Sequence, residues 1–145
     1  MFTPTEIVSK FWEYGNNHNL DALFALIDPE IESDYFSGPV KGRNFFMISM
    51  GAYARAFPDS HDEVTLIVAQ DDFVACEYTE TATFKGPLQS LTGIVPPNGR
   101  NYKMNVASFF RVNANGMITE MRNYFDRTTF MEQTGIDLVS MQKNA

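Results

Sequence analysis

The stretch that decides the fold is "EVTLIVAQDDFVACEYTETATF", residues 63–84. On both sides of Asp71-Asp72, apolar or aromatic residues alternate with polar ones, which is the two-residue period of a β-strand. The two aspartates interrupt this pattern with residues that favour turns. The stretch therefore predicts a β-hairpin whose strands span residues 63–70 and 73–84.

A second alternating pair follows along the chain. Residues 102–112, "YKMNVASFFRV", and residues 117–126, "MITEMRNYFD", are separated by "NANG", a strong turn signal. The two hairpins are connected by residues 85–100, "KGPLQSLTGIVPPNGR", which are rich in glycine and proline. A loop of this length inside a compact domain is more often functional or interface-forming than idle.

Before the hairpins, the apolar residues recur with the 3.6-residue period of helices. Thr3, Pro4 and Glu6 match the N-cap, first-turn proline and capping-box positions of a first helix. Two further helices are expected, from about Leu20 and over residues 44–57, with a short strand at "IESDYF" between them. Helices followed by strands predict an α+β fold, in which one curved mixed or antiparallel sheet wraps over the N-terminal helices and leaves an internal pocket.

The bulk composition restricts the class of protein. A chain of 145 residues fits one common domain, which we assign to residues 1–136, with a loosely held tail at residues 137–145. The net charge of -7, without a basic run, argues against nucleic-acid and anionic-membrane partners. The single cysteine, Cys76, and the lack of a signal-peptide pattern or a long apolar run favour a cytoplasmic location.

Asp126 ends the last expected strand, next to two aromatic residues. Alternation places Tyr124 and Asp126 on one face of the sheet. If that face lines the pocket, desolvation raises the pKa of the Asp126 carboxyl and suits it to take and return a proton. Alternatively, Asp126 is the N-cap of a following helix over residues 127–135, "RTTFMEQTG". The spacing alone favours neither interpretation.

The order of motifs resembles the SnoaL-like polyketide cyclases. They belong to the nuclear-transport-factor-2-like superfamily, with the ketosteroid isomerases and limonene epoxide hydrolases. The shared run is an aromatic-Pro-Asp, a valine-rich hairpin, a loop ending in Pro-Pro-x-Gly-Arg, an arginine-containing strand, a glycine turn, an aspartate and Gln-x-Gly. Its slots are filled by Phe57, Pro58, Asp59, Pro96, Pro97, Gly99, Arg100, Arg111, Gly116, Asp126, Gln133 and Gly135.

The resemblance implies a cone-shaped α+β roll, usually dimeric, with a deep apolar pocket, and it gives Asp126 the slot of the catalytic acid/base. Two slots that hold histidines in cyclases of this family hold Phe84 and Ser108 here. The only histidines, His18 and His61, are expected in surface loops. A mechanism with an imidazole partner is therefore not expected, which leaves a single-carboxylate proton shuttle or a pocket that only binds.

Aromatic residues make up 14% of the chain, which suits a core of large side chains, a pocket for a ring-containing ligand, or both. Glu80 would raise the pKa of Asp126 by like-charge repulsion if its strand face lines the pocket. Ser108 is a candidate hydrogen-bond donor to a substrate oxygen. The complete set of candidate substrate-binding residues is Trp12, Tyr35, Tyr53, Phe57, Glu80, Phe84, Ser108 and Tyr124.

The sequence holds no clustered metal ligands, phosphate loop, nucleophile elbow or dinucleotide fingerprint, so neither a cofactor nor a metal is expected. The leading hypothesis is a cyclase or isomerase that acts on a small apolar carbonyl-bearing or polycyclic molecule by proton transfer through Asp126. The alternative is a non-catalytic module of the same fold that binds a small ligand or dimerises. Epoxide hydrolysis is a third hypothesis. The expected partners are a small apolar molecule and, from the resemblance, a second copy of the chain.

Overall fold

The computed structural model describes residues 1–35, 38–90 and 92–141. It begins with α1 (Pro4–Asn16), whose predicted capping box is confirmed. The Thr3 side chain accepts the Glu6 backbone N–H, and the Glu6 carboxylate accepts the Thr3 N–H in return. One face of α1, which includes Phe11 and Trp12, is buried. The local signals at the start of the chain therefore place the first helix correctly.

The second helix, α2 (Leu20–Phe24), is shorter than its apolar spacing predicts. Ile27 instead begins β1 (Ile27–Tyr35), so the turn-like "DPE" lies inside a strand that is longer than expected. The next strand, β2 (Gly38–Lys41), pairs antiparallel with β1. The following helix, α3 (Arg43–Ala56), stays within one residue of its predicted range.

Both predicted hairpins are confirmed. The first joins β3 (His61–Gln70) to β4 (Phe73–Thr83), and the second joins β7 (Asn101–Val112) to β8 (Ile118–Phe125). The six strands form one mixed sheet in the order β2-β1-β8-β7-β4-β3, in which the β1–β8 pair is parallel. The predicted α+β class is therefore correct.

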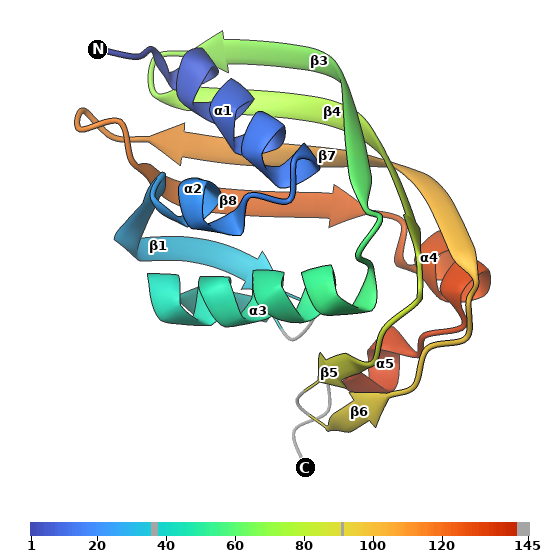
Figure 1. The fold of residues 1–145 in the computed structure, drawn as a ribbon. Helices are drawn as coiled ribbons and strands as arrows, with labels where there is room; N and C mark the ends of the chain where they lie inside the picture. Colours follow the sequence, from blue (N-terminus) through green and yellow to red (C-terminus); the bar gives the residue numbers. More distant parts are fainter. Residues whose placement is uncertain (36–37, 91, 142–145) are drawn as a thin grey trace.

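The sheet curves around the N-terminal helices, and α1, α2 and α3 lie on its hollow side (Figure 1). The alternation of buried and exposed residues along β7 shows which face this is, since the buried side chains include Val106, Ser108 and Phe110. Trp12 and Phe11 of α1 pack edge-on against Phe110. The large aromatic residues thus fill the space between the helical layer and the sheet.

The long connection between the hairpins contains a small second sheet, formed by β5 (Leu88–Ser90) and β6 (Gly93–Val95). Two helices end the described chain, α4 (Arg127–Thr134) and α5 (Leu138–Met141). Leu138 is only 1% exposed, so the start of the expected loose tail is packed; residues 142–145 lie outside the described residues. Of the helices described, none is long and apolar enough to cross a membrane.

Candidate active site

A cavity of about 420 Å³ lies between the inner face of the sheet and the helices α1 and α3. Its walls are largely apolar and include Phe46, Met50 and Met121. The volume falls in the range of small-molecule sites, about 300–1,000 Å³. The carboxyl groups in these walls belong to two sets of hydrogen-bonded polar residues, which lie toward opposite edges of the sheet.

The first polar set joins β1 to β8. The Asn123 backbone N–H donates to the Asp34 carboxylate at 3.0 and 3.2 Å, and the Asn123 side-chain Nδ2 lies 3.4 Å from Asp34 Oδ1. Burial raises the pKa of Asp34, and the Asn123 hydrogen bonds and the Arg122 charge offset this only in part. Asp34 is thus a cavity carboxyl whose pKa is shifted toward neutrality.

A buried chain of hydrogen bonds fixes the position of Asn123. Ser108 Oγ donates to Asn123 Oδ1 at 2.6 Å, and the Tyr78 hydroxyl lies 2.8 Å from the same Oγ. Because the Ser108 proton is used on Asn123, the Tyr78 hydroxyl donates to Ser108. This polarity leaves the Asn123 NH₂ group to face Asp34. Ser108, with no exposed surface, therefore orients a cavity residue and does not meet a ligand itself.

The second polar set, the acid–tyrosine cluster, consists of Tyr53, Asp62, Glu80 and Tyr102. The β3–β4 register places Asp62 directly opposite Glu80. The Tyr102 hydroxyl donates to Glu80 Oε1 at 2.6 Å, and the Tyr53 and Tyr102 hydroxyls are in close contact. Burial, and next the negative charge of Glu80, raise the pKa of Asp62 well above that of an ordinary aspartate.

Asp126 lies outside the cavity. Its side chain is exposed and accepts the Thr129 N–H at 3.2 Å, which is the N-cap interaction of α4. The helix-cap interpretation is therefore confirmed, and the expectation that Asp126 lies among apolar walls is wrong. The alternation placed Tyr124 and Asp126 on the same face correctly, but it is Met121 and Asn123 that face inward.

Three more candidate binding residues, besides Ser108, lie in the core or on the outside. Phe84 is fully buried, and its ring stacks on Phe57, which is 1% exposed and also belongs to the core. Tyr124 is 55% exposed on the outer face, edge-on to Phe109. These side chains do not line the cavity, and their predicted contact with a substrate stays a prediction.

Trp12, Tyr53 and Glu80 do line the cavity, as a substrate-binding role requires. The role itself stays a prediction for all three. The Tyr35 side chain lies outside the described residues. His18 is exposed at the edge of the cavity, and His61 begins β3 rather than lying in a loop.

Sequence reasoning missed Asp34, Asp62 and Asn123. Asp34 was placed on a strand, but only the parallel β1–β8 pairing brings it to Asn123, and no local pattern reports a contact between residues 89 apart. Asp62 follows His61 at the start of β3, where the turn-like "PDS" suggested a loop. The sequence offered one signal for Asp62: extending the β3–β4 hairpin back to it places it opposite Glu80.

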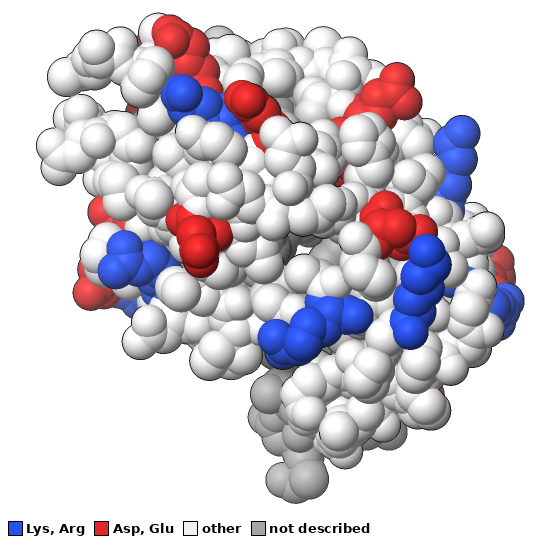
Figure 2. Space-filling model, viewed as in Figure 1, with Lys and Arg blue, Asp and Glu red and all other residues white. Residues whose placement is uncertain are grey.

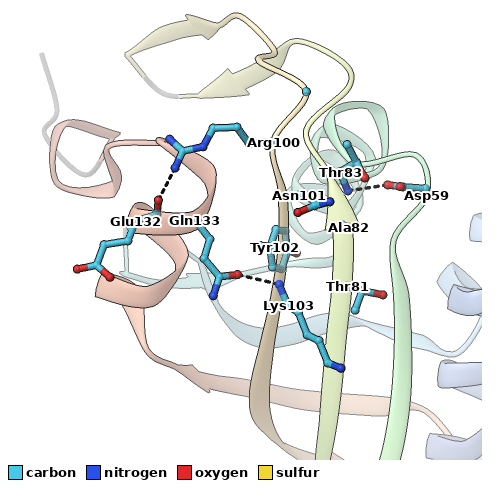
Figure 3. A pocket seen from close by; sticks show the side chains of 11 residues that line it. Asp59, Thr81, Ala82, Thr83, Arg100, Asn101, Tyr102, Lys103, Glu132 and Gln133 are labelled. Atoms are coloured by element: carbon cyan, nitrogen blue, oxygen red, sulfur yellow. Dashed lines mark hydrogen bonds between the residues drawn. The ribbon is translucent and has the colours of Figure 1, made fainter.

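A second, more open hollow of about 820 Å³ lies beside α4 (Figure 3). Its polar groups are largely paired with the protein itself. Arg100 donates to the Glu132 carbonyl at 2.7 Å, Gln133 accepts the Lys103 N–H at 2.8 Å, and Asp59 accepts the Thr83 N–H at 2.7 Å (Figure 3). The cavity at Asp34, which is the less open of the two, is therefore the better candidate site.

Helices laid in the hollow of a curved mixed sheet, with a cavity between the two layers, define the class of nuclear-transport-factor-2-like α+β rolls. A model of the SnoaL-like polyketide cyclases matches residues 5–134, and the chain belongs to this family. No curated protein matches the sequence.

Solved structures agree with this assignment. A protein of Pseudomonas putida KT2440 classed with the polyketide cyclases has a TM-score of 0.76 at 24% identity, over 92% of this chain and 99% of that one. IdmH of Streptomyces antibioticus, classed likewise, has a TM-score of 0.73 at 26% identity, over 93% and 100%. A SnoaL-like protein of Jannaschia sp. CCS1 reaches 0.79 at 20% identity, over 92% of each chain.

Proposed function

We propose that the protein is a cyclase or isomerase that moves a proton on a small apolar carbonyl compound, with Asp34 as the proton acceptor. The observation that carries this proposal is the Asp34 carboxyl in the wall of the apolar cavity, with a pKa raised by burial. Membership of the SnoaL-like polyketide cyclase family supports the reaction class. The base assigned here is not the residue in the family's catalytic slot, because Asp126 is exposed and caps a helix.

The reaction requires a base that removes a proton from the carbon next to a carbonyl group. A general base works best when its pKa lies near the working pH, and partial burial moves Asp34 in that direction. The Asn123 N–H and NH₂ groups hold the carboxylate in place, so that it faces the substrate without having to reorient. The same carboxyl then returns the proton to another atom of the intermediate.

The enolate formed on the way needs a hydrogen-bond donor at its oxygen, and such donors contribute several kcal/mol in comparable sites. Ser49 and Tyr53 lie one turn apart on α3, and both line the cavity. Within the described residues, the Ser49 hydroxyl has no hydrogen-bond partner in the protein, so it is available to a ligand. We assign Ser49 as the donor to the enolate oxygen, because the Tyr53 hydroxyl is already held in contact with Tyr102.

Proton exchange tests this function without knowledge of the natural substrate. The probe is 4-phenylbutan-2-one in D₂O, and NMR follows the loss of the protons next to its carbonyl. Asp34→Asn keeps the shape of the carboxyl but removes the base, so we expect exchange to fall by about 10²–10⁴-fold. Asp126→Asn is the matched control and should exchange at the wild-type rate.

Exchange that survives Asp34→Asn would contradict the assignment of the base. A wild-type protein that binds the ketone without exceeding the buffer rate would instead support the non-catalytic binding module. For wild type, the exchange rate should rise with pH through the raised pKa of Asp34, because only the ionised carboxylate accepts a proton.

A further inference from the structure

The acid–tyrosine cluster lies across the cavity from Asp34. Asp34 is on β1 and Asp62 on β3, and the sheet order places β8, β7 and β4 between them. The two carboxyls therefore lie on opposite sides of the cavity, separated by three strands of the curved sheet. A ligand whose carbonyl lies at Asp34 thus has a distant end that meets a second polar site, which proton transfer at Asp34 does not use.

The cluster contains a hydrogen-bond acceptor that the protein leaves unused. Asp62 Oδ1 is buried and accepts no hydrogen bond from a donor group of the described residues; the Asp62 side chain is paired with the Glu80 carboxyl, itself an acceptor, through the proton that the two acids share. The Tyr102 proton is used on Glu80, and the two Asn16 hydrogen bonds, both 2.8 Å, reach only the Asp62 backbone. Buried acceptors are rarely left unpaired, because they lose the hydrogen bonds that water gave them. The free Oδ1 therefore indicates a donor on the ligand.

The cluster also carries negative charge without a cation. Within the described part of the chain, no Lys, Arg or His side chain lies within ion-pair distance of Asp62 or Glu80. Among the residues that line the cavity, His18 and Arg127 are basic, and both are exposed. The like-charge repulsion that results is one of the causes of the raised pKa of Asp62.

The walls next to the cluster are aromatic. The rings of Trp12 and Tyr78 are 4.4 Å apart, and Tyr53 stacks on Phe57 at 4.9 Å. Trp12, Tyr53 and Tyr78 all line the cavity together with Asp62 and Glu80. Aromatic faces attract ammonium groups, and the attraction is stronger where water is excluded.

We propose that the acid–tyrosine cluster binds a protonated amine at the end of the ligand opposite its carbonyl. The ammonium group donates to Asp62 Oδ1, balances the charge of Glu80 and lies against the aromatic walls. A hydroxyl group would supply the donor but would leave the negative charge unbalanced. The amine site stands on the contacts of the cluster, and only the carbonyl end of the ligand rests on the proposed function.

Binding of the ammonium group is coupled to release of the proton that Asp62 carries. The titratable groups that interact with Asp62 are Glu80 and Tyr78 of β4 and Tyr53 of α3, and Tyr102 of β7 is linked to it through Glu80 and Tyr53. In the empty cavity Asp62 keeps its proton at neutral pH, and a cation beside it favours the ionised form. Affinity for the amine therefore rises with pH until the amine loses its own proton.

Three matched probes test the inference by calorimetry at pH 7. They are 4-phenylbutan-2-ones that carry an aminomethyl, a hydroxymethyl or an ethyl group at the para position. We expect the aminomethyl compound to bind at least tenfold more tightly than the ethyl compound, with release of protons detected in buffers of different ionisation enthalpy. Glu80→Gln and Asp62→Asn should each reduce the preference to about twofold. Glu77→Gln, which removes an exposed charge from the outer face of the same strand, should leave it unchanged.

Equal affinity for the aminomethyl and ethyl compounds, or no binding of the aminomethyl compound, would overturn the inference. Tightest binding of the hydroxymethyl compound would assign the site to a hydroxyl group instead. A preference that survives both cluster variants would place the amine elsewhere. Asp34→Asn separates the two proposals, because it should abolish proton exchange and preserve the preference for the amine.

Discussion

Asp126 holds the first turn of α4 by accepting the Thr129 N–H from an exposed position. Asp126→Ala removes this acceptor, and loss of an N-cap typically costs about 1 kcal/mol of unfolding free energy. Asp126→Asn should cost only a few tenths of a kcal/mol, because asparagine caps nearly as well. Urea denaturation measures both losses of stability. If either variant stays folded but its rate of proton exchange falls clearly below that of wild type, Asp126 has a catalytic role after all.

Asp62 makes stability depend on pH. Its pKa is raised in the folded protein, so between about pH 4, the ordinary aspartate value, and the raised value the folded state binds more protons than the unfolded one. The contribution of Asp62 to the free energy of unfolding is therefore fully present below about pH 4, and it decreases as the pH rises from about 4 to the raised pKa. Asp62→Asn removes the effect and should be more stable than wild type at pH 8 by on the order of 2 kcal/mol.

The pH profile of the unfolding free energy, compared between wild type and Asp62→Asn, checks this expectation. The two proteins should converge near pH 4 and diverge toward pH 8. Glu77→Gln, an exposed change on β4, controls for the loss of one negative charge. A constant difference between Asp62→Asn and wild type across this range would mean that Asp62 has an ordinary pKa.

The roles of single residues were predicted correctly where they depend only on neighbours in the sequence, as helix caps do. The Thr3 cap follows from spacing alone, and the cap role of Asp126 was one of two interpretations that spacing left open. Which face of β8 points inward depends on the packing of the whole sheet, so the alternation could not show that Asn123 rather than Asp126 enters the cavity. The base proposed here, Asp34, needed the three-dimensional contact.

At the scale of elements, the end of α3 is fixed by the chain that leaves β4. The N–H groups of Lys85 and Gly86 both donate to the Ala56 carbonyl, at 2.9 and 3.1 Å. A Cβ atom on Gly86 would come within 2.1 Å of the Arg55 carbonyl oxygen, a distance that requires the backbone to move. Glycine at this position therefore permits close packing of the two elements.

Gly86→Ala should lower the unfolding free energy by about 2 kcal/mol, since overpacking of this kind costs roughly 1–3 kcal/mol. Gly99→Ala is a useful comparison, because there a Cβ meets open space and only the positive φ of 75° opposes it. Thermal or urea unfolding measures both variants. A Gly86→Ala protein as stable as wild type would show that the two elements separate without cost.

The hairpins and α1 were predictable because their signals lie within about 25 consecutive residues. The parallel contact between β1 and β8 was not, since it joins segments far apart in the sequence and leaves no turn signature. The misassignment of Ile27 to a helix has the same origin. Its burial against β8 outweighs the helical spacing of the preceding leucines.

For the whole molecule, the outer face of the sheet is uncovered in a single copy. Leu66, Val68 and Tyr124 are 47%, 53% and 55% exposed. Leu66 and Val68 pair with Glu77 and Ala75 of β4, whose side chains point to the same outer face. By contrast, basic and acidic side chains are interspersed on the face seen in Figure 2. The open sheet face is therefore the surface best suited to bury apolar area against another chain.

The dimer implied by the resemblance stays a prediction, and we propose that a second copy covers this outer face. Light scattering on a size-exclusion column should give twice the mass of 16.4 kDa, and Val68→Lys should shift the protein toward a monomer. Ile48→Lys, another exposed apolar position, on α3, should leave the mass unchanged. A monomeric wild type would contradict the proposal.

The parallel β1–β8 pair also determines when the cavity comes into existence during synthesis. Asp34 and its partner Asn123 are 89 residues apart, so a growing chain presents the apolar faces of α1 and β1 long before β8 leaves the ribosome. Non-local pairings of this kind fold slowly and leave apolar surface open in the meantime. A chain stalled before Ile118 lacks the strand that joins β1 to β7, so its sheet stays in two pieces and Asp34 has no Asn123 to hold it.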